Sequence, residues 1–251
     1  MSENLDFVPK SSAQALTNIF FLIDISGSMD WNGKIDAVNN AVRESLPIIR
    51  DFASKQKECK IQCSVVTFND KVEWIIEGVD AEDLQWIDVK ASGGTRLGET
   101  YKQLSGKLSR HNGGLMAMHM NNAPIIILFT DGCPTDDADT PLTQLKQNKW
   151  FKSAIKIAVE LPGNDIDRQK LIDFATREMV IPVTLDGLKE KLQNIIIQTV
   201  THSLDAEEVL KKAIKENQSE SQEDEAKFNP DNSNTNNDDK SKSLDLDDFD
   251  I

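Results

Sequence analysis

Three short segments of the sequence carry clustered oxygen-bearing side chains of the kind that bind a hard divalent cation. They read Asp-Ile-Ser-Gly-Ser at residues 24–28, Gly-Gly-Thr at 93–95 and Thr-Asp-Gly at 130–132. The five candidate metal ligands in these segments are Asp24, Ser26, Ser28, Thr95 and Asp131. Two carboxylates balance the charge of a divalent ion, and three hydroxyls add neutral oxygens. An all-oxygen set favours Mg²⁺, with Mn²⁺ and Ca²⁺ as alternatives, over zinc or copper.

The glycines inside these segments predict tight backbone turns around the ion. Four of them stand next to the candidate ligands, namely Gly27, Gly93, Gly94 and Gly132. Glycine permits positive φ and close approach of the backbone to a ligand. Since Mg²⁺ usually keeps several water ligands, such an ion would have a coordination position that an outside carboxylate can fill. The site is therefore predicted to bind an acidic side chain of another protein.

The surrounding sequence predicts the elements that position these segments. The apolar runs at 19–25 and 125–129 are typical of strands buried on both faces of a parallel sheet. Residues 34–52 have helical spacing, in which Pro47 predicts a kink or interruption. Further elements are a β-hairpin at 60–76, a helix at 97–108, a strand at 154–161, a helix at 167–177, a strand at 179–183 and a long helix from 188 onwards.

This alternation predicts an α/β fold, Rossmann-like and doubly wound. The sheet is expected to be mostly parallel, with one antiparallel edge strand and helices on both faces. In such sheets ligands bind at the carboxyl ends of the strands, where the strand order reverses. The segments that follow the runs at 19–25 and 125–129 would meet there if those strands are neighbours.

The predicted domain boundaries separate one folded body from a polar tail. They give an N-terminal extension (1–16), the α/β domain (17–204), a continuation of the last helix (205–216) and an acidic tail (217–251). The tail has eleven acidic residues and three lysines, and its small apolar surface cannot offset the entropy of ordering it. Its end, with Phe249 and Ile251, has three open interpretations: a solubilising segment, a docking motif, or a tether whose carboxylates cap the metal site.

The composition argues against several classes of partner. A net charge of −14 is unfavourable for nucleic acid and for anionic membranes, because both attract clustered Lys and Arg. Three cysteines without a Cys-x-x-Cys pair give no disulfide framework or structural zinc site. The first 18 residues lack the apolar run of a signal peptide, and no run is long enough to span a bilayer. We expect a cytoplasmic protein.

The order of the three segments resembles the metal-ion-dependent adhesion site of von Willebrand factor A domains. The similarity extends over about 17–204, and within that family it is greatest to bacterial members of the TerY type, associated with tellurite-resistance and stress-response gene sets. The segments that carry it lie at 20–29, 93–98, 129–136 and 148–152. The resemblance implies direct metal binding by Ser26, Ser28 and Thr95, and binding through water by Asp24 and Asp131. Residues 205–251 contain no cysteine, in contrast to the C-terminal zinc ribbon of some TerY-like proteins.

The resemblance also implies a binding function. It suggests a scaffold in a stress-response or signalling complex beside kinase and phosphatase partners, with an adaptor to an ATPase motor as the alternative. A metal-dependent enzyme of phosphoryl transfer or hydrolysis is a further alternative. The sequence has no Walker-type loop, no Asp-x-Asp nucleophile and no histidine near the three segments. We therefore predict a non-enzymatic module.

Several residues beside the motif have two interpretations each. Met29 and Trp31 either form a rim that packs on a partner or staple the following helix. Arg96 either steers an acidic ligand or is a surface residue at a helix start. The acidic residues at 136–139 form either a second cation site or, preferably, a solvated loop with helix caps.

Overall fold

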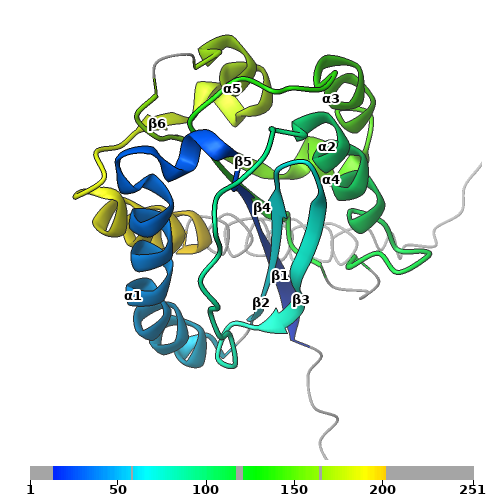
Figure 1. The fold of residues 1–251 in the computed structure, drawn as a ribbon. Coiled ribbons are helices and arrows are strands. Elements are labelled where there is room, and N and C mark those ends of the chain that lie inside the picture. The colour runs from blue at the N-terminus through cyan, green and yellow to red at the C-terminus, as the bar shows by residue number, and fades with distance from the viewer. Residues whose placement is uncertain (1–13, 58, 117–120, 164–165, 202–251) are drawn as a thin grey trace, which may run out of the picture. The chain divides into compact units, whose positions relative to one another are not determined.

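The computed structural model describes residues 14–57, 59–116, 121–163 and 166–201 (Figure 1). The chain divides into two units, Met1–Ala206 and Glu207–Ile251, and all described residues belong to the first. The predicted helix continuation at 205–216 and the acidic tail with Phe249 and Ile251 lie outside the described residues, as does most of the N-terminal extension.

A six-stranded sheet forms the centre of the first unit, in the order β3-β2-β1-β4-β5-β6 (Figure 1). The strands are β1 (Ala15–Asp24), β2 (Cys59–Phe68), β3 (Val72–Asp80), β4 (Ile125–Thr130), β5 (Ile155–Glu160) and β6 (Val180–Pro182). All neighbouring pairs are parallel except β2 and β3, which are antiparallel at one edge. The predicted fold class, with its single antiparallel edge strand, is confirmed.

The central strand β1 is buried along its whole length. Phe20 and Leu22 point into the core on one face of the sheet. Phe21 and Ile23 point into the core on the other face. Because both faces are covered, an unbroken apolar run is the expected pattern for this strand. Burial on both faces fixes the position of Asp24, the residue at its carboxyl end.

Helices cover both faces of the sheet (Figure 1). One face packs against α1 (Lys34–Lys55) and the helical residues 188–201. The other packs against α2 (Leu97–Lys107), α3 (Asp139–Leu145), α4 (Lys149–Ser153) and α5 (Arg168–Phe174). The two short 3₁₀ segments are η1 (Gly27–Gly33) and η2 (Thr176–Glu178). None of the helices in the described part of the chain has the length and apolar character needed to cross a membrane.

The predicted interruption at Pro47 is wrong. The helix α1 continues through Pro47 to Lys55. Proline removes one backbone N–H and leaves the carbonyl of the residue four positions earlier without its helical partner. Here that residue is Arg43, and both Arg43 and Pro47 are exposed. Since water can bind the carbonyl, the helix continues past Pro47 and keeps its buried stripe.

Candidate metal site

The first and third ligand segments meet at the carboxyl edge of the sheet. Asp24 is the last residue of β1, and Asp131 directly follows β4. These two strands are parallel neighbours, with Ile19 opposite Ile125. The strand order reverses here, because β2 and β3 lie on one side of β1 and β4 lies on the other. The site therefore lies at the switch point where α/β sheets open a crevice.

Backbone and side-chain hydrogen bonds hold the second segment between the other two. The N–H of Gly27 donates to the carbonyl oxygen of Gly93 at 2.9 Å. The N–H of Thr95 donates to Thr135 Oγ1 at 2.9 Å, and the N–H of Thr135 donates back to the carbonyl of Thr95 at 2.8 Å. The loop that carries Thr95 is thus fixed by both of its neighbours.

The polar side chains of the site form one connected cluster. Ser26 Oγ lies 3.1 Å from Ser28 Oγ, and Ser28 Oγ donates to Asp131 Oδ1 at 2.8 Å. Asp24 accepts from the N–H of Ser26 at 2.8 Å through Oδ1, and from Thr130 Oγ1 at 2.6 Å through Oδ2. Four of the five predicted ligands are therefore joined by direct hydrogen bonds.

The two carboxylates are buried, although an open pocket lies in front of them. Asp24 is 0% exposed and Asp131 is 2% exposed. Burial raises the pKa of Asp24 to about 6, against the opposing hydrogen bonds from Thr130 and Ser26. The pocket has a volume of about 460 Å³, and its wall includes Ser28, Thr95 and Asp131. Asp24 is not among the residues that line the pocket, and its carboxylate contacts Ser26 and Thr130.

This donor set fits a hard divalent cation. It combines hydroxyl and carboxylate oxygens from three chain segments, which is the chemistry that Mg²⁺, Mn²⁺ and Ca²⁺ accept. Both carboxylate oxygens of Asp24 are engaged with neighbouring groups, as expected for a residue that supports the ion without touching it. Across the described residues, no group of three or more His, Cys, Asp or Glu side chains could hold an ion. The candidate is therefore a hydroxyl-rich site.

The residues beside the motif differ in their exposure. Met29 is fully buried in the core, so its predicted contact with a partner is wrong; the 3₁₀ turn of η1 directs its side chain inward. Trp31, two residues further on, is 67% exposed and lines the pocket. Arg96 is exposed at the N-cap position of α2. Trp31 and Arg96 remain candidates for contact with a partner.

Two of the three acidic residues at 136–139 cap helices, as the preferred interpretation expects, and the third, Asp139, pairs with Lys170 Nζ at 2.7 Å. The carboxylate of Asp136 accepts from the N–H groups of Gly98 at 2.9 Å and Glu99 at 3.0 Å, at the start of α2. The carboxylate of Asp137 accepts from two backbone N–H groups at the start of α3. Since these oxygens satisfy helix N-termini, they do not form a second cation site.

Of the predicted glycines, Gly93 and Gly94 are required by their surroundings. Gly93 has a φ of +76°, and a Cβ there would lie 2.2 Å from Asp70 Oδ2. A Cβ on Gly94 would lie 2.9 Å from Thr135 Oγ1. Neither Gly27 nor Gly94 has the positive φ that glycine permits, and a Cβ on Gly27 would meet only ordinary contacts, the nearest being the carbonyl oxygen of Gly93 at 3.4 Å. A Cβ on Gly132 would likewise meet only an ordinary contact, with Ser28 Oγ at 3.8 Å.

Three residues of the site escaped the sequence analysis. Lys34 is 4% exposed, and its Nζ forms an ion pair with Asp131 Oδ2. Asp70 accepts from the N–H of Gly94 at 3.0 Å and supports the second segment. Gly163 lies so close that an added Cβ would be 2.2 Å from the carbonyl oxygen of Asp131. Lys34 could have been noticed from the sequence, because it is a charged residue shortly after the first motif. Asp70 and Gly163 do not belong to any sequence pattern that would have predicted their role.

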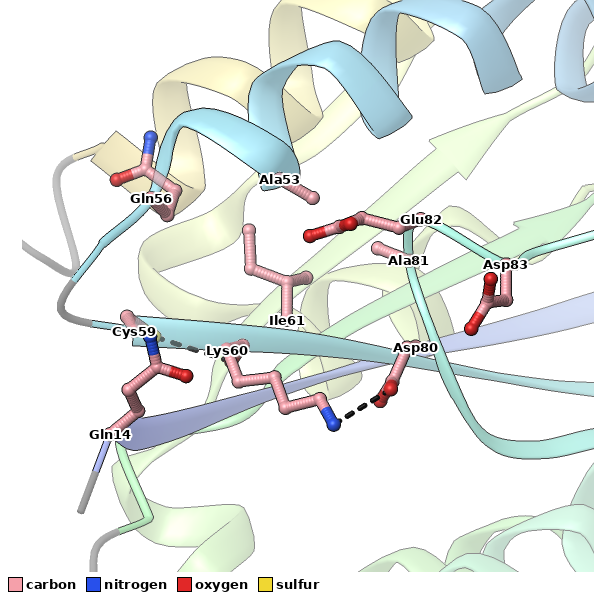
Figure 2. A pocket seen from close by; sticks show the side chains of 10 residues that line it. All are labelled: Gln14, Ala53, Gln56, Cys59, Lys60, Ile61, Asp80, Ala81, Glu82 and Asp83. Carbon is pink, nitrogen blue, oxygen red and sulfur yellow. Dashed lines mark hydrogen bonds and ion pairs between the residues drawn. The ribbon is translucent and has the colours of Figure 1, made fainter. Parts of the chain in front are cut away.

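A second pocket lies at the amino end of β1 and β2 (Figure 2). Its volume is about 280 Å³, and Gln14, Cys59 and Lys60 are among its lining residues. Lys60 Nζ pairs with Asp80 Oδ2 at 2.7 Å, with side chains that are 47% and 32% exposed. Glu82 and Asp83 also line this pocket, but among the described residues no three carboxylates are placed so that they could hold an ion.

The comparisons with known sequences identify one family. A family model for the von Willebrand factor type A domain matches residues 18–195. Inter-alpha-trypsin inhibitor heavy chain H2 of Mus musculus is 33% identical over 184 residues, which is 70% of this chain and 17% of that protein. The Homo sapiens protein is 30% identical over 154 residues, 58% of this chain and 14% of that one. The chain spans less than a fifth of the length of these relatives.

Solved structures share the fold. Proximal thread matrix protein 1 from the mussel byssus, described with a zinc-occupied MIDAS motif, has a TM-score of 0.56 at 20% identity, covering 73% of this chain and 48% of that one. A von Willebrand factor type A protein from Catenulispora acidiphila has a TM-score of 0.54 at 16% identity, covering 72% and 42%. The pilus adhesin SpaC from Lactobacillus rhamnosus GG has a TM-score of 0.56 at 16% identity, covering 73% and 30%.

Proposed function

The chain belongs to the von Willebrand factor type A family, and we propose that it is a metal-dependent protein-binding module. In this proposal Ser26, Ser28 and Thr95 bind a divalent cation, and Asp24 and Asp131 support it. The bound ion supplies an electrophilic coordination position for an Asp or Glu side chain of a partner. The observation that carries the proposal is the connected oxygen cluster at the back of an open pocket.

The choice of ion follows from the donors. The mussel protein is described with zinc in its MIDAS motif, which supports a divalent ion at the matching place in this chain. Oxygen donors without nitrogen or sulfur favour Mg²⁺, with Mn²⁺ or Ca²⁺ as alternatives. We propose Mg²⁺ as the resident ion.

The pocket wall suggests what surrounds the partner's carboxylate. Trp31 and Pro162 line the pocket beside Thr95 and Asp131. The indole of Trp31 is two-thirds exposed, and an exposed aromatic ring beside a polar anchor is typical of a binding hot spot. We propose that the partner places an acidic side chain on the ion and an apolar neighbour against Trp31, while Arg96 adds favourable charge nearby.

Binding is favoured over catalysis by the groups around the pocket. An enzyme of this kind needs a general base beside the reacting centre. Among the ten residues that line the pocket there is no histidine, and the one carboxylate, Asp131, is paired with Lys34. Phosphoryl transfer or hydrolysis is therefore the weaker candidate.

The cellular role is a narrower proposal. The TerY-type sequence segments at 20–29, 93–98 and 129–136 suggest a cytoplasmic scaffold in a stress-response or signalling complex, with kinase or phosphatase partners. An adaptor to an ATPase motor is the alternative. Affinity purification from the native cell, with and without EDTA, distinguishes them by the class of protein that is lost when the metal is removed.

Calorimetry with Mg²⁺ and Mn²⁺ tests the site itself. Wild-type protein should bind one ion, and Thr95→Ala should show no measurable binding, because it removes a ligand from the pocket wall. Thr199→Ala changes a buried threonine in the helix at 188–201 and serves as the matched control. Equal binding by Thr95→Ala and wild type would refute the proposed ligand set.

A further inference from the structure

Lys34 places a buried positive charge inside the candidate site. Its side chain is 5% exposed, and that of its partner Asp131 is 0% exposed. The ammonium pairs with Oδ2 of Asp131, whereas Oδ1 accepts from Ser28 Oγ at 2.8 Å. The carboxylate of Asp131 is thus shared between a fixed cation on one side and the metal-ligand hydroxyls on the other.

Lys34 occupies a position that is unfavourable for a lysine. It is the first residue of α1, where the partial positive charge of the helix N-terminus opposes another cation. Burial of an ammonium group is also costly unless a counter-ion accompanies it. The backbone of Gly33, with a φ of +71°, turns the chain from η1 into α1. This turn places Lys34 where its Nζ contacts Asp131 Oδ2. Helix stability alone gives no reason for a cation here.

The charge of the cluster explains what Lys34 can do. Asp24 and Asp131 carry two negative charges, and Lys34 cancels one of them. With a divalent ion bound, the cluster has a net charge of about +1, whereas without Lys34 it would be about neutral. A positive cluster holds its own metal less tightly and attracts an external carboxylate more strongly.

We propose that Lys34 is a built-in counter-ion to Asp131. Its positive charge lowers the affinity of the site for the metal ion and raises the affinity of the metal-bound site for the partner's carboxylate. It orients Asp131 so that Oδ1 faces the serine hydroxyls, and it keeps the loaded site positive. This inference rests on the proposed function, since it assumes that a divalent ion binds at the cluster.

The first arm of the test is calorimetry of metal-depleted protein with Mn²⁺. Lys34→Met and Lys34→Gln should bind Mn²⁺ roughly tenfold more tightly than wild type, because a like charge next to the ion is removed. Lys34→Arg keeps the charge and should remain near wild type. Lys60→Met, which removes an ion-paired lysine at the opposite edge of the sheet, is the matched control and should change nothing.

The second arm measures binding of acetate, as a probe for a carboxylate, at saturating Mn²⁺. Acetate displaces water from the ion, and the relaxation rate of the water protons reports this displacement. The two neutral variants should bind acetate severalfold more weakly than wild type and Lys34→Arg, since their loaded site has lost its excess positive charge.

The results of the two measurements either support or overturn the proposed role of Lys34. Unchanged or weaker Mn²⁺ binding by the neutral variants overturns it, and so does acetate affinity that equals or exceeds that of wild type. If circular dichroism shows that Lys34→Met is unfolded, Lys34→Gln, which can still donate a hydrogen bond to Asp131, decides the result. Wild-type protein that binds no Mn²⁺ overturns the proposed function instead, so the two failures are distinguishable.

Discussion

The two edges of the parallel strands each carry a pocket with a lysine–aspartate pair, and the two pairs have opposite surroundings. At the carboxyl edge the Lys34–Asp131 pair is buried, next to the equally buried Asp24. At the amino edge the Lys60–Asp80 pair faces solvent. Burial raises the pKa of Asp24 to about 6, whereas the hydrogen bond from Lys60 lowers the pKa of Asp80.

The difference shows that residue types alone do not create a buried cluster of oxygen donors. At the carboxyl edge two parallel strands end side by side and a third segment packs against them, so oxygen donors from three parts of the chain meet at one place. At the amino edge the pair joins two strands of one hairpin. A buried carboxylate gains stability from a nearby cation, whereas an exposed one is already stabilised by water.

The largest expected difference between the edges is the response to metal. At a Mn²⁺ concentration a thousandfold above Kd, the free energy of unfolding of wild type should rise by about 4 kcal/mol. Asp131→Asn should lose nearly all of this gain, and Asp80→Asn should keep it. Chemical denaturation with Mn²⁺ and with EDTA measures both. A full gain in Asp131→Asn would contradict our assignment of the site.

The second difference is the dependence of stability on pH in the metal-free protein. The pKa of Asp24 is about 6 in the folded chain and 3.8 in its ordinary state, so between these values the folded protein holds a proton that the unfolded chain releases. Its contribution to stability is present below about pH 4 and should fall by about 3 kcal/mol as the pH rises through 6. Asp24→Asn should lose this slope in urea denaturation with EDTA.

Asp80 should act in the opposite direction. Because its pKa is lowered by Lys60, its contribution is present at neutral pH and is lost as the pH falls through the folded-state value. Asp80→Asn should therefore change only the acidic end of the same profile. If both variants change the same part of the profile, the two carboxylates do not differ as described.

A third, smaller difference concerns two glycines with similar backbone angles. Gly93 and Gly113 have φ of +76° and +78°, but only Gly93 is crowded, by Asp70 Oδ2; nothing lies within 4 Å of a Cβ on Gly113. Gly113→Ala should cost about 1 kcal/mol of stability from backbone strain. Gly93→Ala should cost about twice as much and weaken Mn²⁺ binding, because Asp70 must release Gly94. Equal costs and equal metal affinity would exclude a role for Asp70.

The smallest expected effect belongs to the exposed ion pair. Lys60→Ala and Asp80→Ala should show a coupling free energy below about 1 kcal/mol in a double-mutant cycle, because solvent screens the pair. Metal affinity should not change in either variant. A coupling free energy of several kcal/mol would contradict the claim that solvent makes the Lys60–Asp80 pair weaker than the buried Lys34–Asp131 pair.

Much of the fold could be predicted from the sequence, because strands buried on both faces have a distinctive pattern. The runs around Phe21 and Ile127 predicted two buried strands, which the structure shows to be neighbours, and the polar residues after them gave the candidate ligands. Lys34 was missed because a lysine at a helix start looks like a surface residue. Its burial depends on the turn at Gly33 and on Asp131, which is 97 residues away.

Two further differences arise from local geometry that residue type does not determine. The sequence left open whether Met29 and Trp31 contact a partner protein or pack on the following helix. In the structure, the 3₁₀ turn η1 buries Met29 and leaves Trp31 exposed. Pro47 was expected to kink or interrupt its helix, but the helix continues, and the affected carbonyl belongs to the exposed Arg43. In both cases, the effect of the residue depends on whether its side of the helical turn faces the sheet or the solvent.

The central position of β1 also has a mechanical consequence. Ten residues of β1 pair in parallel with β2, and five pair with β4. In the proposed function, a partner that pulls on the ion would pull on Ser26 and Ser28, directly after the end of this strand, and hence along its axis. Hydrogen bonds to both neighbours then share the force in shear, instead of breaking one after another as in peeling. Under tension the contact with the partner should therefore rupture before the sheet does.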